Sequence, residues 1–199
     1  MFLDRPQALS DKAVLEGRRS QLATAPHIQS LEQWRADYVA ARSLRIPHFD
    51  PDDAGDQARV LFVLDRPPEE VLSEQGSGFV SVDNPDSSAE RCWIERDAAG
   101  LHNEVLMWNL VPFPASSPTA DDRTAGAKAL GSVLRLLPRL EVVLLCSDMV
   151  QQTWERHLRD RVPRVIAIKA PGVGPQALSR KTKQEELRKA VLRAKRLVG

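Results

Sequence analysis

The feature that most constrains the fold is a repeated alternation of short aliphatic runs with helical stretches. The runs fall at residues 60–64, 104–110, 141–146 and 164–168. Short continuous apolar runs are typical of strands buried on both faces, and helices between them indicate crossovers that join parallel strands. The pattern predicts a three-layer α/β/α sandwich around a four-stranded, mainly parallel sheet.

The first quarter of the chain reads as a helical extension of this sheet. Residues from about Ser10 to Ala23 form a polar helical stretch, and a second stretch begins near Ser30 with Leu31, Trp34 and Tyr38 on one face. The 199 residues suit one domain of ordinary size. We therefore expect a single domain over residues 1–199, with residues 1–50 as a helical extension packed on it.

Charge is uneven along the chain. The formal net charge is only +1, yet residues 176–199 carry eight basic side chains against two acidic ones. Such a basic end is compatible with a nucleic-acid contact, although exposed helix faces are often this charged. The N-terminus shows no signal-peptide pattern, no run reaches transmembrane length, and two cysteines indicate no disulfide framework. A cytoplasmic protein without a membrane segment is the expectation.

Candidate site residues lie where the predicted strands end. The first strand stops at Asp65-Arg66-Pro67-Pro68, since proline cannot donate to a strand ladder. Phe79 follows in the loop Gly76-Ser77-Gly78-Phe79, and Asn109 lies near the end of the second strand. In open α/β sheets, ligands bind at the carboxyl ends of the strands, so these residues predict a binding site.

The order of these segments resembles the uracil-DNA glycosylase superfamily over roughly residues 59–179. Members of that family carry a motif such as G-E-A-P-G, G-Q-D-P-Y-H or G-I-N-P-G after the first core strand. An aromatic residue that stacks on uracil follows, then an asparagine that binds the base edge, and a late H-P-S-P motif that enters DNA. Here Pro67 matches the proline of the first motif, Phe79 the aromatic residue, Asn109 the asparagine and Pro171 the proline of the last motif.

The resemblance implies a protein that binds DNA and flips one nucleotide into a pocket, with removal of a damaged or deaminated base as the implied reaction. It also implies site roles for Asp65 and Arg66 in the first motif. The loop after the last strand and the basic terminal segment would hold DNA through Lys169, Gly172, Gly174, Arg180, Lys181 and Lys183. Leu178 corresponds to an apolar wedge that fills the vacated base stack.

Two departures from the family pattern bear on catalysis. Ala170 stands where the last motif has histidine, so the side-chain donor to the departing base is missing. Arg66 occupies a position where the family has Asp, Asn or Ala, and a guanidinium does not act as a base. We therefore expect weak or absent uracil excision, and the protein is either a divergent glycosylase or a non-catalytic module that binds a nucleobase, nucleotide or partner.

Simpler interpretations remain open for single residues. Asp65 also fits a turn cap, Asn109 a structural asparagine, and the basic terminal helix a solvated surface. The four histidines fit no metal-ligand spacing, and two cysteines cannot supply the four ligands of the iron–sulfur cluster that some family members hold. We expect no metal and no cofactor.

Overall fold

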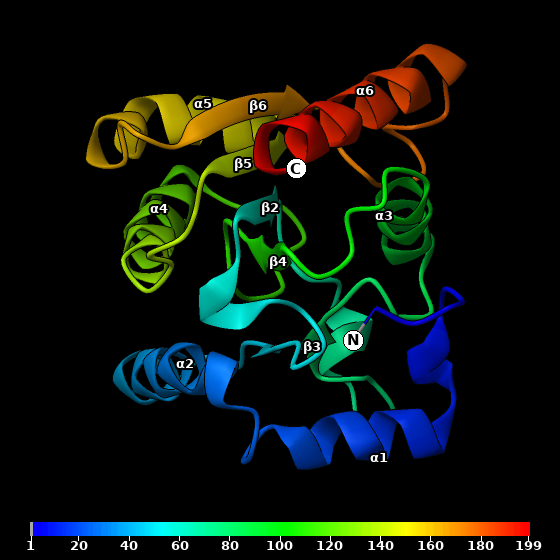
Figure 1. Ribbon diagram of the computed structural model, residues 1–199. Coiled ribbons are helices and arrows are strands. Elements are labelled where there is room, and N and C mark those ends of the chain that lie inside the picture. The colour runs from blue at the N-terminus through cyan, green and yellow to red at the C-terminus, as the bar shows by residue number, and fades with distance from the viewer. Residues whose placement is uncertain (1) are drawn as a thin grey trace.

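Residues 2–199 are described by a computed structural model, which has an α/β fold around a four-stranded sheet (Figure 1). The strands are β2 (Val60–Leu64), β4 (Val105–Asn109), β5 (Val142–Cys146) and β6 (Ile166–Ala170). They lie in the order β4-β2-β5-β6, and each neighbouring pair is parallel. The predicted α/β class and the four-stranded parallel sheet are confirmed.

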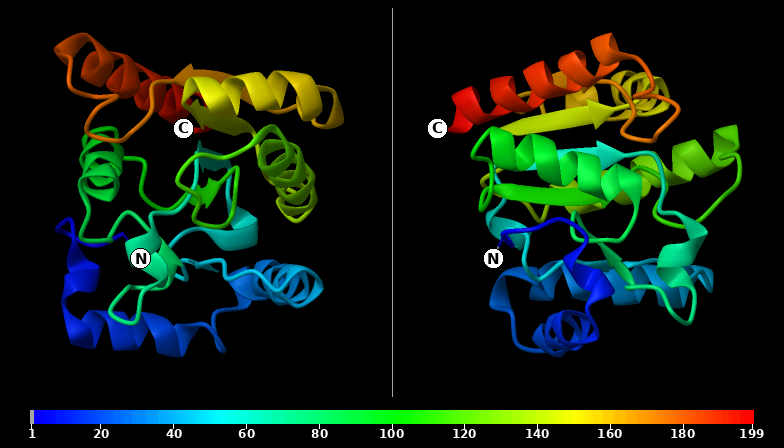
Figure 2. Two further views of the ribbon diagram at one scale, coloured as in Figure 1. Left: turned by 180° about the vertical axis from the view of Figure 1, so that it is seen from behind. Right: turned by 90° about the vertical axis from the view of Figure 1, so that its right-hand side faces the viewer.

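Helices lie on both faces of this sheet (Figures 1 and 2). On one face are α4 (Ala120–Leu134) and α5 (Asp148–His157), and on the other are α3 (Ser87–Ala98) and α6 (Lys181–Val198). The chain runs outward from β2 to β4, then crosses back to β5 and β6, and right-handed crossovers in opposite directions place helices on opposite faces. Short 3-10 helices join these elements at Ala8–Ser10, Pro26–Ile28, Gly55–Gln57, Glu69–Leu72 and Arg159–Arg161.

Burial explains the aliphatic character of the two central strands. Val60–Val63 of β2 and Val142–Leu145 of β5 are each 0% exposed, because helices cover both of their faces. Helix α4 packs closely against the backbone at the end of β4. A Cβ atom at Gly126 of α4 would lie 2.4 Å from the carbonyl oxygen of Leu110, so glycine allows this helix to lie directly on the end of β4.

The last strand begins two residues later than predicted. Val162–Val165 forms a turn closed by a hydrogen bond from the Val165 amide to the Val162 carbonyl, and β6 starts at Ile166. Lys169 and Ala170 are therefore the end of a strand, not the start of the following loop. β6 is also an edge strand, and Ile166 is 42% exposed.

The N-terminal part lies beyond β4, at the edge of the sheet opposite β6 (Figure 1). It comprises α1 (Lys12–Gln21), α2 (Gln29–Arg42) and a short parallel pair of β1 (His48–Phe49) with β3 (Phe79–Val80). The pair was not predicted. The Trp108 side chain of β4 joins this part to the sheet, since its ring stacks on Phe49 with 3.7 Å between ring centroids.

The buried residue of helix α1 is an arginine. Leu15 and Leu22 are only half-buried, whereas Arg18 is 2% exposed and is the one buried residue of the helix.

Candidate functional site

A cavity of about 940 Å³ opens at the carboxyl ends of β2, β4 and β5. Leu64, Asn109 and Cys146, the last residues of those three strands, all line it. The remaining walls come from residues 65–71, 79–81, 84, 86–89, 107, 115–116 and 172–177. A concave site of this size at the strand ends of an α/β sheet is typical of ligand-binding sites.

The structure brings four of the predicted site residues to this one cavity: Asp65, Arg66, Phe79 and Asn109 all line it. They are far apart in sequence and come from β3, β4 and the loop after β2. Their convergence is what the strand-end argument predicted, while the role of each residue stays a prediction.

Asp65 lies where β2 and β5 separate at the strand ends. The hydroxyl of Ser147, just after β5, donates to Asp65 Oδ1 and accepts from the amide of Val150, 3.2 Å away, in the first turn of α5. Burial raises the pKa of Asp65, although the Ser147 hydrogen bond and the charge of Arg66 act in the opposite direction. The carboxyl group is therefore oriented by protein contacts on one side and lines the cavity.

Asn109 is a buried amide without a partner. Its side chain lies in the cavity wall at 2% exposure, and within the described part of the chain it forms no hydrogen bond. Buried amides are nearly always satisfied, so an unpaired one that lines a cavity indicates a ligand that supplies the missing partner. The amide offers both a donor and an acceptor to such a ligand.

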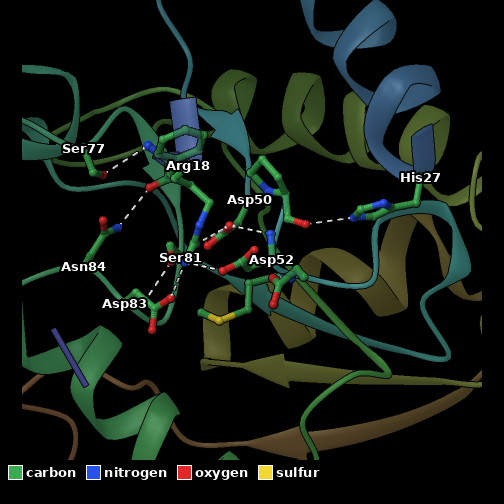
Figure 3. A network of polar contacts seen from close by, with 12 residues as sticks. Arg18, His27, Asp50, Asp52, Ser77, Ser81, Asp83 and Asn84 are labelled. Atoms are coloured by element: carbon green, nitrogen blue, oxygen red, sulfur yellow. Dashed lines mark hydrogen bonds and ion pairs between the residues drawn. The ribbon is translucent and has the colours of Figure 1, made fainter. Parts of the chain in front are cut away.

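Asn84 is a second cavity-lining amide, and the sequence did not single it out. Its Nδ2 donates to the carbonyl oxygen of Phe79 at 2.9 Å (Figure 3), whereas its Oδ1 is buried without a partner among residues 2–199. The hydrogen bond fixes the loop between Phe79 and Asn84 as a compact turn. A polar residue directly before Pro85 and a helix cap at Asp86 is the only sequence signal that pointed to it.

The glycines near Phe79 suggested a flexible loop, but the structure places Phe79 in a strand. It begins β3, its side chain is 1% exposed, and its amide donates to Ser77 Oγ at 3.1 Å. The pairing of His48 with Phe79 in the β1–β3 ladder holds the backbone. The ring is thus a rigid part of the cavity wall.

A buried ionic cluster holds the 81–84 turn against α1 (Figure 3). The guanidinium of Arg18 lies 2.5 Å from Asp50 Oδ1, 2.6 Å from Asp52 Oδ2 and 2.9 Å from Asp83 Oδ2. Burial alone would lower the pKa of Arg18, but the three carboxylates raise it. The amide of Asp83 also donates to Ser81 Oγ at 3.0 Å. The N-terminal helix thereby fixes the turn that carries Asn84.

The predicted DNA-contact residues divide into two groups. Gly172 and Gly174 line the cavity, and Arg180, Lys181 and Lys183 are exposed near the start of α6. Lys169 is exposed on β6 and is not part of the cavity wall.

The burial of Leu178 does not fit its expected role as an apolar wedge. It is 5% exposed and belongs to the hydrophobic core, so it is not available to enter a base stack. The Leu178 carbonyl also accepts from Gln184 Nε2 at 2.8 Å, which ties it to α6. Its apolar side chain anchors the loop before α6.

The structure shows where Arg66 and Ala170, the two departures from the family motifs, lie. Arg66 is exposed at the rim of the cavity, and its Nη2 donates to the carbonyl of Ser116 at 3.1 Å. Ala170 is 3% exposed, and Gln151 Nε2 donates to its carbonyl at 2.9 Å. Neither residue supplies a neutral donor or a base to the cavity.

Other ligand types find little support in residues 2–199. No group of three or more His, Cys, Asp or Glu side chains has the arrangement of a metal site, and Cys92 and Cys146 are both buried and free. Within the same residues, no helix combines the length and apolar character needed to cross a membrane.

No family model fits the chain, and no curated protein is similar to it in sequence. The functional argument therefore rests on the cavity and its residues.

Proposed function

We propose that this protein is a divergent uracil-DNA glycosylase-like protein, which binds DNA and takes one flipped nucleobase into the 940 Å³ cavity. The observation that carries the proposal is the convergence of Asp65, Phe79 and the unpaired amide of Asn109 on that cavity. These are the three residues that the family pattern assigns to water orientation, base stacking and base recognition.

Base binding follows from the chemistry of the wall. Phe79 is the aromatic residue of the cavity wall, and a base that stacks on its ring would gain about 1–3 kcal/mol. The Asn109 amide has a free donor and a free acceptor, which matches the adjacent acceptor and donor on the edge of a pyrimidine. The Oδ1 atom of Asn84 is a further acceptor without a partner among the described residues.

Asp65 is the general base of hydrolysis in this proposal, and the carboxylates of Glu69, Glu70 and Asp86 also line the cavity. Asp65, oriented by Ser147, is placed to accept a proton from a water that attacks the sugar carbon. No side-chain donor at position 170 stabilises the departing base, and loss of one such donor typically lowers a rate by roughly 10²–10³. We therefore propose slow excision, with base binding retained.

A binding role without turnover is the second candidate. It is favoured by the buried methyl group of Ala170 and by the exposed position of Arg66, since neither takes over the chemistry of the residues they replace. In that case the cavity holds a nucleobase but the glycosidic bond stays intact.

The test pairs two measurements on uracil-containing single- and double-stranded oligonucleotides: base release, detected by cleavage at abasic sites, and binding, detected by fluorescence anisotropy. Asn109→Ala should weaken binding of the uracil strand at least tenfold, whereas Asn103→Ala, an exposed asparagine outside the cavity, should leave it unchanged. Slow release that Asp65→Ala abolishes identifies the enzyme, and binding without release identifies the module. Equal affinity of the wild type and Asn109→Ala would overturn the proposal.

A further inference from the structure

A second cavity, of about 430 Å³, adjoins the first one at Phe79 and Val71, which line both. Its other walls are α1, α2, the segment after α2 and residues 71–78. The Phe79 side chain is thus a common wall between the proposed base site and this neighbouring space.

Three arginines from three different segments line this second cavity. Arg19 lies on α1, Arg35 on α2, and Arg45 in the segment that leads to β1. Each is held in place by backbone carbonyls: Arg19 donates to Gly76 at 3.0 Å, Arg45 to Leu72 at 2.6 Å, and Arg35 to Pro47 at 2.9 Å and Ile46 at 2.8 Å.

These carbonyls orient the guanidinium groups but do not neutralise them. Among residues 2–199, neither Arg19 nor Arg45 forms an ion pair. Glu32 Oε2 is 4.0 Å from Arg35 Nη1, but it lies 2.7 Å from Nδ1 of His48, and Oε1 accepts from the Phe49 amide at 2.9 Å. Of the three arginines, only Arg35 has a carboxylate of the described residues within 4.0 Å, and that carboxylate is already engaged by His48 and Phe49.

The surroundings of Arg35 do not fully compensate the positive charge of its guanidinium group. Its side chain is 18% exposed, and burial lowers its pKa, with Glu32 only partly opposing the shift. A guanidinium has five N–H groups, and the contacts described above use at most two of them on any one arginine. Guanidinium N–H donors that no group of residues 2–199 uses, and the positive charge that they carry, therefore lie together at the second cavity.

We propose that this arginine-lined cavity binds a phosphate group. Guanidinium groups match the oxygens of phosphate in paired hydrogen bonds, and three of them converge here from separate segments. Because Phe79 separates the two cavities, a phosphate in the second lies one side chain away from a base that stacks in the first. The assignment to a backbone phosphodiester of the bound strand rests on the proposed function, whereas phosphate recognition itself does not.

Inorganic phosphate is the first probe, titrated calorimetrically at constant ionic strength. The double variant Arg19→Gln/Arg45→Gln removes the two cations that lack ion pairs within the described residues, and we expect its dissociation constant for phosphate to rise at least tenfold. The control Arg156→Gln/Arg164→Gln removes the same charge from exposed positions outside the cavity and should change binding less than twofold. Absence of saturable phosphate binding to the wild type, or equal binding by both double variants, overturns the proposal.

The second probe is a single-stranded uracil oligonucleotide, measured at several salt concentrations. If the phosphate belongs to the strand, Arg19→Gln/Arg45→Gln should reduce the slope of log K against log salt by about 0.7 for each lost phosphate contact. An unchanged slope with phosphate binding lost identifies a free phosphate-bearing ligand instead. Failure of oligonucleotide binding in the wild type counts against the proposed function, not against the phosphate site.

Arg45→Lys separates a binding effect from a folding effect. Lysine keeps the charge but loses the planar fork, so phosphate binding should be intermediate while the melting temperature stays near that of the wild type. If the melting temperature of Arg19→Gln/Arg45→Gln without phosphate equals that of the control variant, loss of phosphate binding is assigned to the site. If Arg45→Lys binds phosphate no better than the single variant Arg45→Gln at equal stability, the charge at position 45 does not hold the ligand and the proposal fails.

Discussion

Replacement of Arg18 by methionine tests whether the buried ionic cluster holds the cavity together. The change leaves the carboxylates of Asp50, Asp52 and Asp83 around an apolar side chain. Removal of one partner from a buried ion pair costs about 3–5 kcal/mol. For a chain of this length each kcal/mol lowers the melting temperature by roughly 2–4 °C, so a fall of roughly 6–20 °C is expected.

The loss should depend on pH, with a sign fixed by the carboxylates. Burial raises the pKa of Asp83, and the Arg18 hydrogen bond lowers it, so removal of Arg18 raises the pKa in the folded state further. A carboxyl group whose folded-state pKa is raised stabilises the protein when protonated, and this contribution is lost as the pH rises through that pKa. The deficit of Arg18→Met should therefore be largest at neutral pH and shrink as the pH falls towards the ordinary aspartate range.

Urea unfolding followed by tryptophan fluorescence, at neutral and at mildly acidic pH, measures both effects. Lys12→Met is the matched control, because Lys12 is an exposed cation in the same helix and its loss should change stability by no more than about 0.5 kcal/mol. A deficit under about 1 kcal/mol, or one that is independent of pH, would refute the view that the carboxylates depend on Arg18. Weaker uracil-strand binding by a folded Arg18→Met protein would show that the cluster positions the 81–84 turn.

Three further substitutions have defined expectations. Asp65→Asn should raise the free energy of unfolding in urea at neutral pH, because burial raises the pKa of Asp65 and so disfavours its ionised form. The gain should vanish at a pH where Asp65 is protonated in both the folded and the unfolded wild type. A variant less stable than the wild type at neutral pH would contradict this. Gly126→Ala should destabilise by about 1–3 kcal/mol in thermal unfolding, because its Cβ would meet the Leu110 carbonyl at 2.4 Å, whereas Gly131→Ala in the same helix meets a side chain at 3.4 Å and should be neutral or stabilising. Phe79→Leu should weaken uracil-strand binding by about tenfold or more in fluorescence anisotropy while stability falls by less than about 1.5 kcal/mol; unchanged affinity would remove the stacking role.

Much of the sheet follows from the sequence because its strands are buried on both faces. Val60–Leu64 is a strand with the predicted bounds, and β4 and β5 begin one residue later than predicted. The error at β6 has a physical cause: an edge strand with one open face has a weak aliphatic signal, so the turn that ends at Val165 was included in it. Convergence of Asp65 and Asn109 followed from topology alone, since carboxyl ends of parallel strands meet at one edge.

The contacts around the 940 Å³ cavity were harder to predict from the sequence because they join distant segments. Arg18 meets carboxylates more than thirty positions away, and nothing in a polar helix marks one arginine as buried. The two-residue strands that fix Phe79 are too short to show periodicity. Ser147 directly follows an apolar run, but a hydroxyl at that place fits a helix cap as well as it fits a site residue.

The parallel order of the sheet also governs how the chain reaches this structure. No β-hairpin is present in residues 2–199, since each strand pair there is parallel. The central strand β2 pairs with strands that begin at Val105 and Val142, so its contacts form only after long loops close, and refolding should be slow for that reason. A chain released before β5 is made would carry β2, a strand without a polar residue, as an open edge, which is a template for aggregation.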